Sequence, residues 1–173
     1  NCTSLKKVIF VEGEKEQNPF FPPFMMSGGI IEESAFANCK SLTEITIPDD
    51  FDNLGNNVFY QCSNLTGVTL SNKIVNIGEN VFASCSKLTE ITIPDSVKNI
   101  GRFCFFDCTS LTALTIPSGV TEINSRLFMN CSSLTILNLS KNIRSIHDDI
   151  FIGCTQPIRI NYNGTRNEWV SIK

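Results

Sequence analysis

Apolar residues recur along the chain at a fixed spacing of 23 residues. Phenylalanine stands at the same place in six successive segments, at Phe36, Phe59, Phe82, Phe105, Phe128 and Phe151. Cysteine follows three residues later each time, at Cys39, Cys62, Cys85, Cys108, Cys131 and Cys154. A fixed period of about 20–29 residues is typical of a leucine-rich solenoid. The pattern therefore predicts stacked repeats, in which each repeat buries its apolar columns against its neighbours.

Each repeat also predicts its own local elements. Apolar and polar residues alternate in LTEITIP (88–94), which predicts a short strand with one buried face. The segment ENVFASC (79–85) is too short for a stable helix, so we expect about one helical or 3₁₀ turn there. One column contains only residue types that tolerate positive φ, which predicts a left-handed turn. That column is Gly55, Gly78, Gly101, Asn124 and His147.

The regular repeats cover residues 36–150, and the chain departs from them at both ends. Residues 1–35 read as an atypical first repeat with an insertion at about 12–27. Residues 151–173 keep a strand and then turn into a short helical stretch, which predicts a cap over the apolar end of the stack. We expect a single domain over 1–173. Because NCTSL resembles the middle of a repeat, we also expect a piece of a longer protein.

The repeat unit reads F-x-x-C-x-x-L-x-x-I-x-I-P-x-x-V-x-x-I-G, and FASCSKLTEITIPDSVKNIG (82–101) shows it nearly whole. This pattern resembles the BspA-like leucine-rich repeat family, and the terminal INYNGTRNEW is similar to the closing segment of bacterial members. The resemblance implies a right-handed, horseshoe-like α/β solenoid with a parallel sheet on its concave side and short helical or 3₁₀ turns on its convex side. It also implies a secreted or cell-surface protein, with signal and anchor absent from this piece, that adheres to a host or microbial surface component.

Charge changes this picture little. The 17 acidic and 14 basic residues give a net charge of −3 and are scattered along the chain. Nucleic-acid binding needs a basic stripe, so nucleic acid is not expected as a partner. No apolar run approaches the roughly 18 residues of a spanning helix, so direct membrane insertion is not expected.

The 8 cysteines admit several kinds of chemistry. Zinc needs about four ligands that converge, commonly from closely spaced pairs, whereas the column cysteines lie 23 residues apart. Disulfides between adjacent rungs fit the usual Cα distance but not the usual Cβ distance of about 3.8 Å. A nucleophilic cysteine would need a base, and His147 is the only histidine. We therefore expect buried, reduced thiols that pack as core residues.

Two acidic clusters could hold calcium, namely Asp49-Asp50-Asp52 and Asp148-Asp149. Neither matches a loop motif such as the EF-hand, so solvated turns are the simpler interpretation. We expect no metal, no cofactor and no enzymatic activity, because the sequence shows no set of base, nucleophile and metal ligands.

The outward strand positions form the first candidate binding surface. It consists of Glu44, Thr46, Thr69, Glu90, Thr92, Thr115, Asn138 and Arg159. Solenoids usually contact partners on the concave face, and this face is expected to be polar, with little charge and no aromatic ring. Threonine also suits any exposed strand, so an ordinary solvated sheet surface is the alternative.

The second candidate is the insertion, where Phe20, Phe21 and Phe24 lie among prolines. Exposed apolar residues near a loop can mark an interaction site, but the same side chains can fold back over the solenoid. The sequence as a whole predicts a non-enzymatic protein-binding or adhesion module. The alternative function is a structural spacer that presents another domain, and the oligomeric state stays open.

Overall fold

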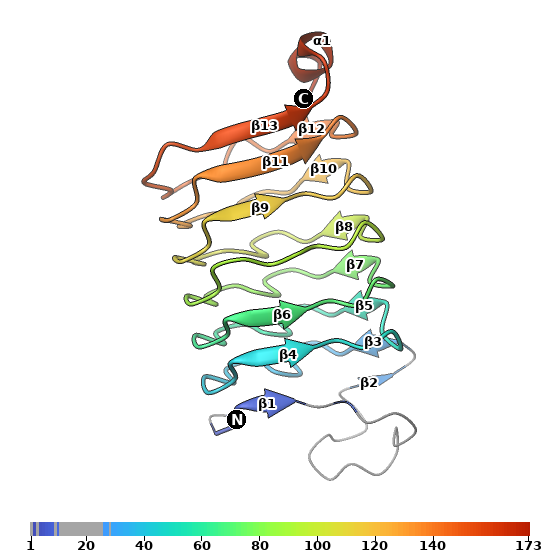
Figure 1. Ribbon diagram of the computed structural model, residues 1–173, viewed down its shortest axis with the longest axis vertical. Helices are drawn as coiled ribbons and strands as arrows, with labels where there is room; N and C mark the ends of the chain where they lie inside the picture. Colours follow the sequence, from blue (N-terminus) through green and yellow to red (C-terminus); the bar gives the residue numbers. More distant parts are fainter. Residues whose placement is uncertain (1, 3, 9, 11–25, 28) are drawn as a thin grey trace.

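The computed structural model describes residues 2, 4–8, 10, 26–27 and 29–173 and shows a parallel β-solenoid of about six turns (Figure 1). Two rows of short strands run along the stack. Row A consists of β1 (Lys7–Val8), β4 (Glu44–Thr46), β6 (Gly67–Thr69), β9 (Ala113–Thr115), β11 (Ile136–Ser140) and β13 (Arg159–Asn163). Row B consists of β3 (Ile30–Ile31), β5 (Asn53–Leu54), β7 (Asn76–Ile77), β8 (Asn99–Ile100), β10 (Glu122–Ile123) and β12 (Ser145–Ile146).

The strand register follows the sequence period. Thr46 lies opposite Thr69 in row A, and Asn53 lies opposite Asn76 in row B, each pair 23 residues apart. β2 (Met26–Ser27), at the end of the expected insertion, is the one strand of the described residues that pairs antiparallel, and its partner is β3. One 23-residue period of the sequence therefore corresponds to one turn of the solenoid.

A third face, which we call the turn face, joins row B back to row A. It consists of the turns at 33–38, 56–61, 79–84, 102–107, 125–130 and 148–153. In the first turn, the N–H groups of Ser34, Phe36 and Asn38 donate to carbonyl oxygens of the next repeat at 2.9, 2.9 and 2.7 Å. Because these N–H groups bond between repeats, they cannot form helical bonds within a repeat. The expected helical or 3₁₀ turns are therefore not confirmed.

Left-handed residues lie on the turn face and not where the sequence suggested. Positive φ occurs at two positions of each of the first five turns, for example 59° at both Asn57 and Gln61. The column of Gly55, Gly78 and Gly101 has no positive φ, so the prediction of a left-handed turn there is wrong. Glycine is required there for space, because a Cβ on Gly101 would lie 2.5 Å from the Gly78 carbonyl carbon.

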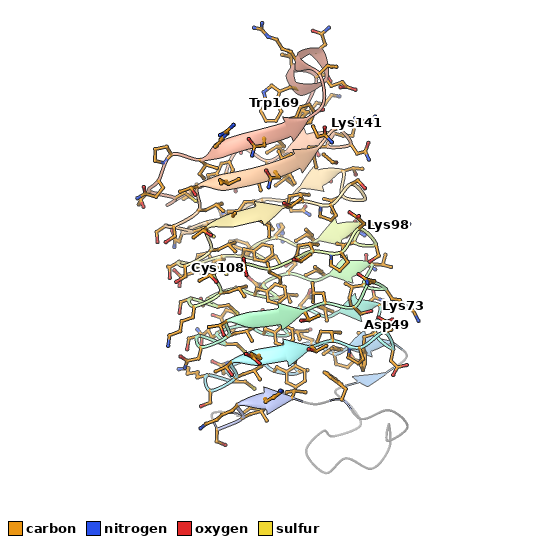
Figure 2. The ribbon with its side chains drawn as sticks, in the orientation of Figure 1. Asp49, Lys73, Lys98, Cys108, Lys141 and Trp169 are labelled. Atoms are coloured by element: carbon orange, nitrogen blue, oxygen red, sulfur yellow. The ribbon has the colours of Figure 1, made fainter. Side chains whose placement is uncertain are left out.

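The interior between the three faces is a stack of identical side chains. The phenylalanine rings at 36–128 are 1% exposed or less, and successive ring centroids from Phe36 to Phe151 lie 5.6–5.9 Å apart. Cys62, Cys85, Cys108 and Cys131 each donate the thiol hydrogen to the phenylalanine carbonyl oxygen 26 residues earlier, at 3.0–3.3 Å. Cys108 shows this inward position (Figure 2).

The C-terminal end is only partly covered. The single helix of the described residues, α1 (Arg166–Val170), begins at Thr165, whose side chain and backbone exchange hydrogen bonds with Glu168 in a capping box. The Trp169 ring packs on Tyr162 with centroids 5.2 Å apart, yet Trp169 and Ile160 each stay 37% exposed. A hollow of about 290 Å³ remains at this end. Its lining includes Ile160, Trp169, Leu137, Leu139 and Phe151.

Candidate functional site

Row A is interrupted at one rung. The sequence predicts a strand over 88–94, but Glu90–Thr92 form no strand in the structure, and this expectation is wrong. Within the described ranges, β6 pairs only with β4, and β9 pairs only with β11. The rung between them is joined to the β9 side by one bond, from the Thr112 N–H to the Thr89 oxygen at 3.2 Å, and among the described residues no backbone bond joins it to β6.

A hollow of about 820 Å³, the first hollow, lies over the interrupted rung. Its wall includes Thr66–Thr69 from one side, Glu90–Asp95 from the middle and Ala113–Thr115 from the other side. Ile91 and Ile93 contribute to its floor and are 8% and 7% exposed, whereas Ile45 and Ile47 in the intact rung β4 are 3% and 2% exposed. The missing pairing thus coincides with a surface depression that reaches toward the core.

A second hollow of about 460 Å³ adjoins the first and shares Asp95 and Thr115 with it. Asn138 and Asn161 contribute polar side chains from β11 and β13, and Tyr162 also borders this hollow. In this second hollow the polar groups are already joined, because Asn138 donates to the Thr115 hydroxyl at 2.9 Å and Asn161 donates to Asn138 at 2.8 Å. The second hollow is therefore more preorganised than the first.

The charged residues of the two hollows all carry the same sign. Glu90 and Asp95 line the first hollow, and Asp95 also lines the second, with no lysine or arginine in either lining. Lys73, Lys98 and Lys141 lie along an edge of the stack (Figure 2), and none of them lines either hollow. The depressions in row A are therefore acidic sites on a chain of nearly balanced charge.

The structure brings some of the predicted contact residues together and leaves others apart. Thr69, Glu90, Thr92 and Thr115 all line the first hollow, and Asn138 lines the second. The remaining predicted residues, Glu44, Thr46 and Arg159, lie on row A outside both hollows. The second candidate, Phe20, Phe21 and Phe24, lies outside the described residues.

Several lining residues were not identified from the sequence. Asp95 directly follows Pro94, at the end of the expected strand and before the chain turns toward row B. This position recurs in each repeat, and that recurrence is the sequence signal that could have indicated Asp95 as a lining residue. Tyr162 borders the second hollow, but it is partly buried against the core, as its column predicted, and its ring packs on Trp169.

The cysteine column has no arrangement suited to catalysis. Burial raises the pKa of the Cys62, Cys104 and Cys131 thiols to about 12, and it raises the pKa of Cys85 and Cys108 well above the usual range. All eight cysteines carry free thiols. A thiol with a raised pKa supplies little thiolate near neutral pH, which is the form that acts as nucleophile or metal ligand.

The other titratable candidates are held in local contacts. Asp149 accepts from Ser125 at 2.7 Å and pairs with Arg126 at 3.2 Å, and these contacts lower its pKa. His147 lies 3.3 Å from the Glu122 carboxylate. Over the part of the chain that the structure describes, no group of three or more His, Cys, Asp or Glu side chains could hold a metal ion.

Stacked parallel rungs with a 23-residue period define a leucine-rich repeat solenoid. The family model described as BspA type leucine rich repeat region matches residues 29–159 in 6 copies, and the chain belongs to this family. Such proteins are typically interaction scaffolds and not enzymes. Among curated proteins, a search gives no match.

Solved structures of bacterial leucine-rich repeat proteins are similar to the chain. A T. pallidum protein has a TM-score of 0.74 at 28% identity over 78% of this chain and 62% of that one. A cell-surface protein of Faecalibacterium prausnitzii has a TM-score of 0.56 at 27% identity over 83% of this chain and 32% of that one. A Bacteroides ovatus protein has a TM-score of 0.55 at 28% identity over 71% and 38% of the two chains.

The chain spans less than two thirds of each of these three relatives. The helices found among the described residues include none with the length and apolar character needed to cross a bilayer.

Proposed function

We propose that the chain is the protein-binding module of a secreted or cell-surface protein, acts in adhesion, and contacts its partner over row A as the concave face of the solenoid. The observation that carries this proposal is the pair of adjoining hollows on row A, which gather five of the eight predicted contact residues. The F. prausnitzii relative is described as a cell-surface protein, which supports the proposed location.

The shape of the surface also suits a macromolecular partner. The two hollows together run over successive rungs from β6 to β13, so they offer many shallow contacts and not one enclosed pocket. Extended surfaces of this kind are what solenoids use to bind partners. Polar groups in the second hollow are held by the Thr115–Asn138–Asn161 hydrogen bonds, which reduces the entropy lost when a partner binds.

Replacement of Thr69, Thr92 and Thr115 together by lysine tests this proposal. All three side chains are exposed, so the fold should persist while added bulk and charge obstruct both hollows. The probes are purified extracellular-matrix proteins and purified microbial surface proteins, and binding is measured by surface plasmon resonance on the intact chain. At least one probe should bind the unmodified chain and lose most of its affinity for the triple variant.

A matched variant controls for the added charge. Thr121, Thr155 and Gln156 are also exposed and lie outside both hollows, so their joint replacement by lysine adds the same charge elsewhere. This control should bind as the unmodified chain does. Equal binding by all three proteins would place the contact surface elsewhere, and no binding by any probe would favour the structural spacer.

A further inference from the structure

The following inference rests on the proposed function and concerns the chemistry of the partner. We infer that the partner presents an extended segment to the first hollow and places a lysine or arginine side chain against Glu90. Three features of the hollow carry this inference: the small residues beside Glu90, the sign of the charges and the backbone of the rung, which is unpaired on its β6 side.

The side chains beside Glu90 leave room for a partner group. In the row A column that contains Glu44, Gly67, Glu90, Ala113, Ile136 and Arg159, the smallest residues, Gly67 and Ala113, stand one repeat before and one repeat after Glu90. Both line the first hollow together with Glu90. The Glu90 carboxylate is therefore exposed between two small residues, and a partner group can approach it from either side along the stack.

The charge of the site selects a cation. Among the described residues, Glu90 takes part in no ion pair or side-chain hydrogen bond, and Asp95 is the other charged residue of the hollow. By contrast, Glu79, Glu122 and Asp149 elsewhere on the stack each have a basic partner within 3.3 Å. A partner that covers the hollow lowers the local dielectric, which strengthens attraction to a positive side chain and repulsion of a negative one.

The backbone of the rung selects an extended segment. In the neighbouring steps of row A, the N–H of Thr66 donates to Thr43 at 2.9 Å and the N–H of Thr135 donates to Thr112 at 2.9 Å. The N–H of Thr112 also donates to Thr89, at 3.2 Å, whereas the described residues contain no equivalent bond from Thr89 to Thr66, so the rung is open on its β6 side. A partner that covers these open backbone groups must offer donors and acceptors of its own, and the backbone of an extended chain supplies both at strand spacing.

Blocked synthetic peptides provide the probe. In one peptide threonine alternates with lysine, in a second with glutamate and in a third with glutamine. Titration of each peptide into the intact 173-residue chain by fluorescence anisotropy gives three affinities. The lysine peptide should bind about tenfold more tightly than the glutamate peptide, and this preference should decrease as salt is added.

Two substitutions assign that preference to Glu90. Glu90→Gln should remove most of the preference for the lysine peptide, and Glu90→Lys should reverse it in favour of the glutamate peptide. Glu33→Gln makes the same change at an exposed residue outside both hollows and should leave all affinities unchanged. Thermal unfolding by circular dichroism checks that each variant is folded.

Three results would overturn the inference: equal affinity for the lysine and glutamate peptides, an effect of Glu33→Gln as large as that of Glu90→Gln, or no binding of any peptide. Glutamate in place of Thr69, Thr92 and Thr115 separates this failure from that of the proposed function. A protein probe that loses binding to the lysine variant and keeps it with the glutamate variant supports both proposals. Equal loss with either charge keeps row A as the contact surface and rejects the cationic segment.

Discussion

The thiol of one repeat and the phenylalanine carbonyl of the previous repeat form a bond that recurs along the whole core. For Cys85 the acceptor is the Phe59 oxygen at 3.3 Å, and that oxygen also accepts the N–H of Cys62 at 3.1 Å. A small apolar side chain that also satisfies a buried carbonyl explains why cysteine, and not alanine, fills this column. Packing and hydrogen bonding, and not reactivity, therefore explain why cysteine recurs in this column.

These thiols predict how stability depends on alkaline pH. The pKa of Cys62, Cys104 and Cys131 is raised from 9.0 to about 12 by burial, so the folded state retains protons that the unfolded state loses. Their contribution is fully present below pH 9.0 and is lost as pH rises toward 12. The free energy of unfolding, measured by urea titration, should fall through this range. A flat profile between these values would contradict ionisation of buried, reduced thiols.

Two glycines with different surroundings, one against backbone and one against a flexible side chain, should respond oppositely to alanine. In Gly101→Ala the new methyl group would lie 2.5 Å from the backbone nitrogen of Glu79, so the rung must shift at a cost of about 1–3 kcal/mol. In Gly67→Ala the nearest atom is the flexible Glu44 Cγ at 3.3 Å, and loss of backbone entropy in the unfolded chain should make the change neutral or stabilising by up to about 1 kcal/mol. Thermal unfolding measures both, and equal effects would contradict the close approach of the backbones.

At the scale of elements, the incompletely paired rung at 88–94 makes a prediction about amide exchange. Ile47, Ile93 and Ile116 occupy the same column, and the N–H of Ile47 and of Ile116 donate to the next rung at 2.8 and 2.9 Å. Ile93 has no such bond in the described part of the chain. Its amide hydrogen should therefore exchange at least roughly tenfold faster than the other two, as measured by NMR. Equal protection at the three residues would show that row A is continuous.

At the scale of the whole molecule, the sequence period predicted the stack and its core. The phenylalanine column from Phe36 to Phe128 is buried as expected, because a repeated apolar position can only be covered by its own copy in the next repeat. The turn face could not be predicted in this way. Its segments have the length of about one helical or 3₁₀ turn, and only the position of the next repeat decides that alternate N–H groups, such as those of Ser34 and Phe36, bond between repeats.

The candidate site was likewise predicted only in part from the sequence. The alternation in LTEITIP correctly placed Glu90 and Thr92 on the exposed side of row A. The same alternation could not show that this rung would be unpaired, because pairing depends on the spacing of two neighbouring rungs and not on one segment. The hollow lies over that rung, and Asp95 and Tyr162 line the adjoining one.

The turn face also gives the stack a mechanical asymmetry. Row A is interrupted at Glu90–Thr92, and row B separates between β8 and β10. On the turn face the bonds continue through the same repeats, with Ser84 donating to Phe106 at 2.7 Å and Asp107 donating to Met129 at 2.8 Å. Under a tensile load along the stack, the two strand rows would therefore separate first in these repeats. The continuous hydrogen bonds of the turn face would then carry the load.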